Sequence, residues 1–258
     1  MLLAVPPADF VLHNSLFLIA HFHNVIIGGV IFGVMAGYNY WFPKAFGFTL
    51  DERLGKASFW CWLIGFYLAF MPLYVLGLMG MTRRMQHYSN PDWQPWLIAA
   101  AVGAVVIFVG VGLQIAQLVV SIRTREERRD LTGDPWNGRT LEWSTPSPPP
   151  AYNFAVLPKV EGIDAWWAMK QAGGPRHAPR YEAIEAPRNS AAGFIAAFFA
   201  VMIGFALIWH IWWMALVGIL GAFVTVLVSA WRLDDEEEIP AAELARLEAA
   251  HRRTGQGA

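Results

Sequence analysis

The sequence predicts an all-α protein that crosses a membrane several times, and three observations lead to this fold class. Hydrophobic residues make up 56% of the 258 residues and charged residues only 15%, against about 45–50% and about 25% in soluble domains. The mean hydropathy is +0.38. About five apolar stretches also approach or exceed the ~20 residues that a membrane-spanning helix needs. We therefore expect a polytopic membrane helix bundle.

Five spans are expected, in order, at residues 11–42, 57–81, 96–122, 191–209 and 212–231. The first three are expected to form a core within residues 1–122. Only His210 and Ile211 separate the last two spans, which predicts a tight hairpin over residues 191–231. Tryptophans flank its tip, as is typical of a membrane–water interface.

Two polar segments complete the predicted organisation. Residues 123–190 are rich in proline, which argues against long helices and favours an extended, partly packed arm. Residues 232–258 form a charged tail that starts with acidic residues and continues as a short amphipathic helix, with Leu244 and Leu247 on one face.

Loop charges predict the orientation of the spans. Of the 19 lysines and arginines, only Arg83 and Arg84 fall in loops on the other side of the membrane from the rest. Since basic residues favour the cytoplasmic side, the arm and the carboxyl terminus are expected in the cytoplasm. The net charge of −1 disfavours nucleic acid as a partner. The single cysteine, Cys61, excludes a disulfide framework or a thiolate metal cluster within this chain.

The first span carries the main candidate site, the pair His21 and His23. Two positions apart on a helix are separated by about 200°, so the two imidazoles leave opposite sides. They therefore cannot readily share one metal ion, but each could be the axial ligand of a different haem. The alternative is that each histidine is hydrogen-bonded to a neighbouring helix.

Asp9 and His13 are four residues apart and share a face if the helix extends that far. An intramembrane carboxylate–imidazole pair also fits a proton relay in a transporter, which is an alternative from another class. That alternative leaves the opposed histidines unexplained.

Arg83 and Arg84 are adjacent cations on the predicted outer side. A guanidinium binds carboxylates in a planar, bidentate fork, and haem carries two propionates. The alternative is an arginine pair that interacts with the carboxyl end of a helix.

The residues that carry these features resemble a known family. Residues 12–29 read LHNSLFLIAHFHNVIIGG and resemble the tenth core helix of subunit I of the haem–copper terminal oxidases, most closely the cytochrome bo-type ubiquinol oxidases. Further matching motifs follow in order: YWFPKAFGF at 40–48, FMPLY at 70–74, GMTRR at 80–84, and GDPW at 133–136, which leads to TLEW at 140–143 and PPP at 148–150. The resemblance covers essentially the whole chain.

The resemblance implies roles for individual residues. His21 would be the axial ligand of the high-spin haem, where oxygen is reduced, and His23 an axial ligand of the low-spin haem. His13 and Asp9 would lie close to the propionates of the high-spin haem, and Arg83 and Arg84 would pair with propionates. The implied cofactors are a low-spin haem of b type, a high-spin haem of o or a type, and copper.

The resemblance also implies what this chain does not supply. The three copper histidines, the second ligand of the low-spin haem and the quinol-binding residues belong to earlier helices, so no copper ligand is expected here and the chain is expected to be a carboxyl-terminal part, inactive alone. Partners would be those amino-terminal helices, oxidase subunits II, III and IV, ubiquinol and oxygen, in a bacterial inner membrane.

Asn14 replaces the aspartate with which cytochrome c oxidases help to hold magnesium, which favours quinol as the electron donor. The alternatives are a cytochrome c oxidase subunit I or a non-catalytic truncated membrane fragment.

Overall fold

The computed structural model describes residues 2–160, 162–173, 180–231 and 236–255. It divides the chain into two compact units. The first contains the residues up to Pro149 and the segment Ile163–Ala168, and the second contains Pro150–Gly162 and the described residues from Met169 onward. Each unit is described separately.

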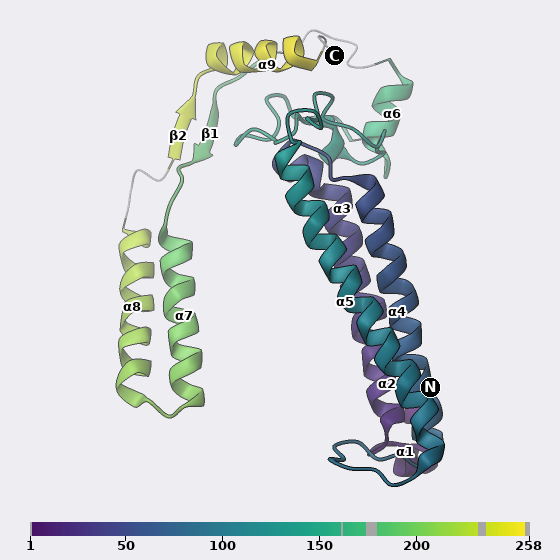
Figure 1. Cartoon of the computed structure of the whole chain (residues 1–258). Coiled ribbons are helices and arrows are strands. Elements are labelled where there is room, and N and C mark those ends of the chain that lie inside the picture. Colours follow the sequence, from purple (N-terminus) through teal and green to yellow (C-terminus); the bar gives the residue numbers. More distant parts are fainter. Residues whose placement is uncertain (1, 161, 174–179, 232–235, 256–258) are drawn as a thin grey trace. The chain divides into compact units, whose positions relative to one another are not determined.

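The first unit is a bundle of long helices (Figure 1). Its elements are η1 (Leu2–Ala4), α1 (Pro6–Leu12), α2 (Leu16–Val25), the π-helix η2 (Ile26–Ile31), α3 (Phe32–Phe46), α4 (Glu52–Leu78), η3 (Pro91–Trp93), α5 (Gln94–Arg123) and η4 (Leu141–Ser144). The helix α6 (Ala165–Gln171) begins in this unit.

Four helices in the described residues are long and apolar enough to cross a membrane: Leu16–Phe46, Glu52–Leu78, Pro91–Arg123 and Trp212–Ala230. The chain is a polytopic helical membrane protein, as the composition predicts. The helix α7 (Ala192–Ile208), with 17 residues, is slightly shorter than the fourth span predicted at residues 191–209. The hairpin turn ends it, where His210 has a left-handed backbone with φ of 55°.

The expected first span, 11–42, is wrong at its start. The chain turns at His13–Ser15, so α1 is a separate helix and the span begins at Leu16. Ser15 causes the break, because its hydroxyl accepts from the backbone N–H of Phe17 and caps α2, which is what an N-cap serine does at a helix start.

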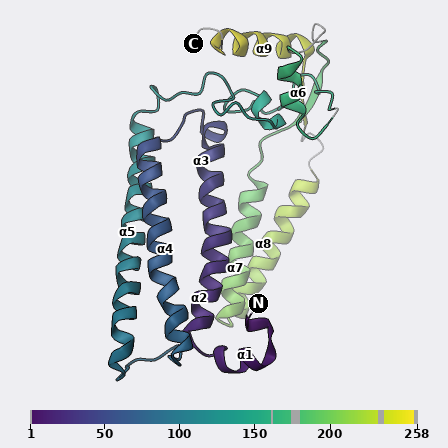
Figure 2. The same ribbon diagram turned by 90° about the vertical axis from the view of Figure 1, so that its right-hand side faces the viewer.

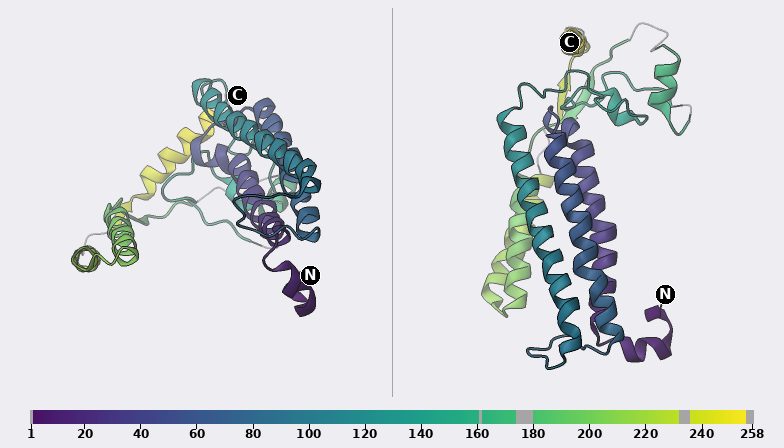
Figure 3. Two further views of the ribbon diagram at one scale, coloured as in Figure 1. Left: turned by 60° about the horizontal axis from the view of Figure 1, so that its bottom comes forward. Right: turned by 45° about the vertical axis from the view of Figure 1, so that its right-hand side comes forward.

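Close helix packing holds the bundle together. The helices α4 and α5 run side by side along their length (Figure 3), and Gly65 and Gly103 lie where the two backbones approach each other closely. A Cβ at Gly103 would collide with the backbone of Ala69. The helix α2 also packs on α4, whereas α3 stands apart from α4 (Figure 2).

The arm that follows α5 packs on the end of α3. This packing is closer than expected from the sequence, which predicted an extended, partly packed arm. Lys44 is 8% exposed and its ammonium donates to the carbonyls of Gly133 at 2.8 Å and Thr145 at 2.6 Å. Trp143 is 1% exposed, and its indole N–H donates to the hydroxyl of Tyr40. We call the end of the bundle that carries these contacts the arm end.

The second unit contains a helical hairpin and a small sheet. The helices α7 and α8 (Trp212–Ala230) pack against each other, with Gly218 against Ile203 and Gly221 against Phe199. The strands β1 (Ile184–Pro187) and β2 (Glu236–Ile239) pair antiparallel. The sequence does not predict this sheet.

The carboxyl-terminal helix α9 (Ala241–Gly255) matches the predicted amphipathic helix. Leu244 on its apolar face is fully buried. The hydroxyl of Tyr152 donates to the carboxylate of Glu248 at 3.3 Å. Burial and the neighbouring Glu248 charge raise the pKa of Tyr152 to about 12.

Candidate functional site

The candidate site begins at the turn between α1 and α2. The hydroxyl of Ser15 donates to the carbonyl of Leu12 at 2.7 Å and accepts from Phe17 N–H at 3.2 Å. Ser15 is 4% exposed, so one buried hydroxyl both closes α1 and starts α2. This cap fixes where the helix with the histidine pair begins.

The loop after α4 is joined to this turn. Leu16 N–H donates to the carbonyl of Met81, Arg83 N–H donates to the carbonyl of Asn14, and Ser15 and Thr82 form an isolated β-bridge. Gly77 permits this approach, because a Cβ there would collide with the backbone of Phe17. The arginine pair therefore lies beside the start of α2.

The two arginines differ in their contacts. Arg83 Nε donates to Asn14 Oδ1 at 3.0 Å. The guanidinium therefore has further donors beyond the one that Asn14 occupies. Arg84 is exposed and has a left-handed backbone with φ of 64°. The arrangement offers cationic donors at this end of the bundle, one of them oriented by Asn14.

Asp9 and His13 are close, as their spacing predicts. His13 Nδ1 lies 3.6 Å from Asp9 Oδ1, and their side chains are 62% and 39% exposed respectively. Both residues lie before Leu16, outside the membrane-spanning helix. The pair is therefore not part of the helix that is long and apolar enough to cross a membrane, whereas the transporter alternative expects it within a span.

His23 is held in a defined orientation. Its Nδ1 lies 2.7 Å from the carbonyl oxygen of Ile19, and its ring stacks on Phe70 of α4 with a centroid distance of 4.4 Å and an interplanar angle of 17°. Phe22 packs at 4.3 Å. A neutral imidazole that donates through Nδ1 presents the Nε2 lone pair to a ligand.

His21 lies on the same helix and is half-buried. Within the part of the chain that the structure describes, its ring has no hydrogen-bond or ring partner. Since α2 is regular from Leu16 to Val25, the two imidazoles project about 200° apart. The alternative of a hydrogen bond to a neighbouring helix is not what the described contacts show, because His23 bonds to its own helix and His21 has no such bond among the described residues.

These contacts are compatible with the hypothesis that His21 and His23 are ligands of two different haems. The Nδ1 contact of His23 leaves one ring nitrogen for iron, and the Arg83 guanidinium retains donors for a carboxylate. Among the described residues, no three His, Cys, Asp or Glu side chains lie close enough to hold a metal ion. The histidines therefore fit separate partners, one on each side of α2.

Sequence reasoning missed three features of the site. The stacking of Phe70 on His23, the contact of Asn14 with Arg83, and the π-helix η2 directly after the histidine pair depend on structure that hydrophobic periodicity does not report. The run Gly28–Gly29 was the one available signal for η2. Single π-turns often occur beside functional sites.

The geometry defines a class of protein, a polytopic helical membrane protein with two opposed imidazoles on one helix and cationic side chains near the start of that helix. The family model for "Cytochrome C and Quinol oxidase polypeptide I" matches residues 1–106. The chain is 62% identical over 252 residues to a "Probable cytochrome c oxidase subunit 1" of Bradyrhizobium diazoefficiens. It is 55% identical over 258 residues to a "Ubiquinol oxidase subunit 1" of Acetobacter aceti.

A third relative, a "Cytochrome bo(3) ubiquinol oxidase subunit 1" of Buchnera aphidicola, is 50% identical over 251 residues. The three alignments cover 96%, 98% and 96% of this chain but only 38%, 39% and 38% of the relatives. The chain belongs to the cytochrome c and quinol oxidase polypeptide I family and spans somewhat more than a third of the length of these relatives.

Proposed function

We propose that this chain is the carboxyl-terminal part of the catalytic subunit of a haem–copper ubiquinol oxidase, an enzyme that reduces oxygen to water and translocates protons. One observation carries the proposal. His21 and His23 lie on opposite sides of α2, and the backbone contact of His23 Nδ1 leaves its other ring nitrogen available. One helix can thus serve two haems.

In this proposal His21 binds the iron of the high-spin haem and His23 that of the low-spin b-type haem. Phe22 and Phe70 hold the His23 ring in one plane, and the carbonyl of Ile19 fixes its tautomer. When bound, the haems supply electron transfer and the oxygen-binding iron. The protein contributes fixed imidazole orientations and a short path along one helix.

Arg83, Arg84, His13 and Asp9 are proposed to face the propionates. Arg83 is oriented by Asn14, which keeps its remaining donors together. The exposed Asp9–His13 pair lies immediately before Asn14 and adds a titratable group at this end. Charge-assisted bonds to carboxylates would hold the cofactors at a fixed height on α2.

The copper ligands and the second ligand of the low-spin haem are proposed to come from the amino-terminal helices of subunit I. Subunits II, III and IV are the other proposed protein partners. Alone, the chain is proposed not to reduce oxygen, since it offers one ligand for each haem. Oxygen uptake by the purified 258-residue chain would contradict that part of the proposal.

Ubiquinol is the proposed electron donor. Asn14 Oδ1 accepts from Arg83, so the position that would carry an aspartate in a magnesium site is a neutral partner of an arginine. A cytochrome c oxidase is the second candidate, because one relative bears that name. The complete enzyme should be supplied in parallel with a short-chain ubiquinol and with reduced cytochrome c, and faster turnover on cytochrome c would overturn the choice.

The proposed location is a bacterial inner membrane, with the arm end and the carboxyl terminus in the cytoplasm. The loop charges support this orientation. A protease added to sealed right-side-out vesicles should spare the arm and the tail. Cleavage in the arm or the tail would show that both face the outside and would contradict the proposed orientation.

The ligand assignment is tested in the complete oxidase with His23→Met and, as a matched control, Asn24→Gln on the same helix. His23→Met should remove the low-spin haem signal from the reduced-minus-oxidised spectrum and retain the high-spin signal. Asn24→Gln should keep both. An unchanged low-spin signal in His23→Met would refute the role of His23.

A further inference from the structure

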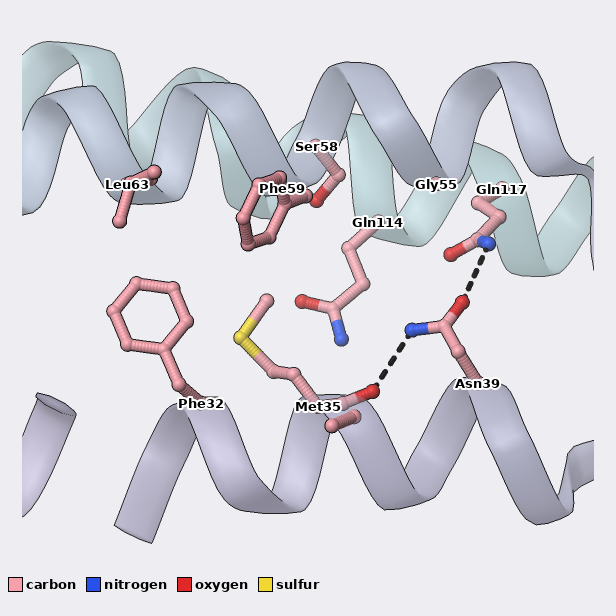
Figure 4. Close-up of a pocket in the computed structure, with 10 residues that line it drawn as sticks. Phe32, Met35, Asn39, Gly55, Ser58, Phe59, Leu63, Gln114 and Gln117 are labelled. Carbon is pink, nitrogen blue, oxygen red and sulfur yellow. Dashed lines mark hydrogen bonds between the residues drawn. The ribbon is translucent and has the colours of Figure 1, made fainter. Parts of the chain in front are cut away.

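A cavity of about 240 Å³ lies between α3, α4 and α5 (Figure 4). The cavity is amphipathic. Its apolar wall is formed by Phe32, Met35, Ala36, Phe59 and Leu63, and its polar wall by Asn39, Ser58, Gln114 and Gln117 beside Gly55. None of these side chains is charged, so the chemistry of the site suits a neutral hydrogen-bonding occupant.

The course of the helices opens this cavity. The helix α2 packs on α4, but α3 makes little contact with it after the π-helix η2. Gly55 widens the space, because a Cβ there would press against the amide of Gln117. The separation of α3 from α4 and the lack of a side chain at Gly55 together form the cavity.

Three of the polar side chains are hydrogen-bonded to the protein. Gln117, which is 2% exposed, donates through Nε2 to Asn39 Oδ1 at 3.0 Å and to the carbonyl of Asp51 at 3.1 Å. Asn39 donates to the carbonyl of Met35, and Ser58 to that of Gly110, each at 2.8 Å. These bonds leave other acceptor sites facing the cavity.

Gln114 differs from the other three. Its side chain has no hydrogen-bond partner among the residues that the structure describes, and Figure 4 shows its amide directed into the space between α3 and α4. An amide without partners in a membrane-spanning bundle is unfavourable, because neither lipid nor an apolar wall can bond to it. A ligand with both donors and acceptors would remove that cost.

The polar contacts continue toward the arm end. The backbone N–H of Asp51 donates to the hydroxyl of Ser121, which donates to the carbonyl of Gln117. The carboxylate of Asp51 pairs with Arg128 at the end of the bundle. Hydrogen-bonded polar groups thus extend from this end of the bundle to the cavity wall.

We propose that the cavity is a hydration site that holds a cluster of ordered water bound to Gln114, Gln117 and Asn39. Its volume suffices for several waters at about 30 Å³ each, and a water needs the two to four polar partners that this wall offers. The occupant is uncharged, as the lining requires. This site is separate from the opposed histidines and does not depend on the function proposed for them.

The test uses radiolytic hydroxyl-radical footprinting of the complete oxidase, because radicals form from water next to the side chain that they oxidise. Met35 lines the cavity and reports on it. Met85, 41% exposed in the loop after α4, is the wet reference, and Met202 within α7 is the apolar reference. Oxidation of Met35 should approach that of Met85 and exceed that of Met202 by roughly tenfold, as expected for a residue beside ordered water.

Two variants and a control test the cause. Ala36→Leu fills the cavity and Gln114→Leu removes the unpaired amide, and each should lower Met35 oxidation about fivefold by displacing water. Ile115→Leu, at an exposed position of α5, should leave the oxidation unchanged. Met35 oxidation as slow as that of Met202 in the unmodified enzyme would show that the cavity is dry and overturn the proposal, whether or not the variants assemble.

Discussion

Arg83 Nε donates to Asn14 Oδ1 at 3.0 Å, and the backbone N–H of Arg83 donates to the carbonyl of the same asparagine at 3.0 Å. These two bonds join residues 69 positions apart in the sequence. Because Ser15 caps α2 immediately afterwards, the loop with the arginines and the start of the histidine helix form one structural element.

We expect Asn14→Ala to lower the stability of this element by about 1 kcal/mol, since it removes the acceptor for Arg83 Nε. Asn14→Asp should be milder, because a carboxylate accepts the same bond with an added charge interaction. The measurement is the half-life of the haem absorbance of the complete oxidase at a fixed elevated temperature. An alanine variant as durable as the unmodified enzyme would contradict the importance of this bond.

We expect Gly77→Ala to impair assembly, because the added Cβ would press on the backbone of Phe17. Overpacking of this kind costs about 1–3 kcal/mol. The readout is the yield of haem-containing oxidase in membranes. Gly112→Ala on α5 is the matched control, since nothing lies within 4 Å of a Cβ there. Equal yields from the two variants would exclude the predicted close contact.

Lys44→Met should loosen the arm. The substitution leaves the carbonyls of Gly133 and Thr145 without the ammonium, and each unsatisfied buried group costs about 1–3 kcal/mol. Limited proteolysis should cut within residues 130–149 several-fold faster. Lys56→Met is the control, because the Lys56–Glu52 pair is exposed and contributes little. The prediction fails if both variants are cut at the same rate.

The charge of Asp51 should give a pH-dependent stability. The hydrogen bond from Leu54 N–H, with Arg128 next to it, holds the pKa of Asp51 below its ordinary value. A carboxyl with a lowered pKa stabilises the fold above its unfolded pKa, near 3.9, and loses that contribution as the pH falls through the folded pKa.

Asp51→Asn preserves the helix cap and removes the charge. Its half-life at elevated temperature should be shorter than that of the unmodified enzyme at pH 7, and the two should converge as the pH falls through the lowered folded-state pKa of Asp51. Glu52→Gln, at an exposed side chain, should show no such convergence. If the difference in half-life between the two enzymes stayed the same at low pH, the charge of Asp51 would not be its cause.

The lengths of the apolar stretches predicted most of the long helices, because a membrane-spanning helix needs about 20 consecutive apolar residues. The expected 96–122 and 212–231 agree closely with Gln94–Arg123 and Trp212–Ala230. The opposition of His21 and His23 followed from the pitch of a helix alone. Features that depend on local spacing within one element were accessible in this way.

Features that depend on distant partners were not accessible. Phe70 looks like an ordinary apolar residue of the second span until its ring is seen to stack on His23, 47 positions earlier in the sequence. The strand Glu236–Ile239 looks like a solvated acidic run, because its pairing with Ile184–Pro187 spans about fifty residues. Trp143 and Lys44 are likewise buried by segments that no local pattern connects.

The π-helix at Ile26–Ile31 sets how the two halves of the first span face their neighbours. Each residue added to or removed from a helix turns everything beyond it by about 100°. Removing one residue from this segment, such as Gly29, would restore an even α-helical winding and swing Met35 and Asn39 away from α4, while His21 and His23 stayed in place. The wider π-turn thus acts as an angular offset, so that the residues after Ile31 face a different direction from the one that an uninterrupted α-helix would give them.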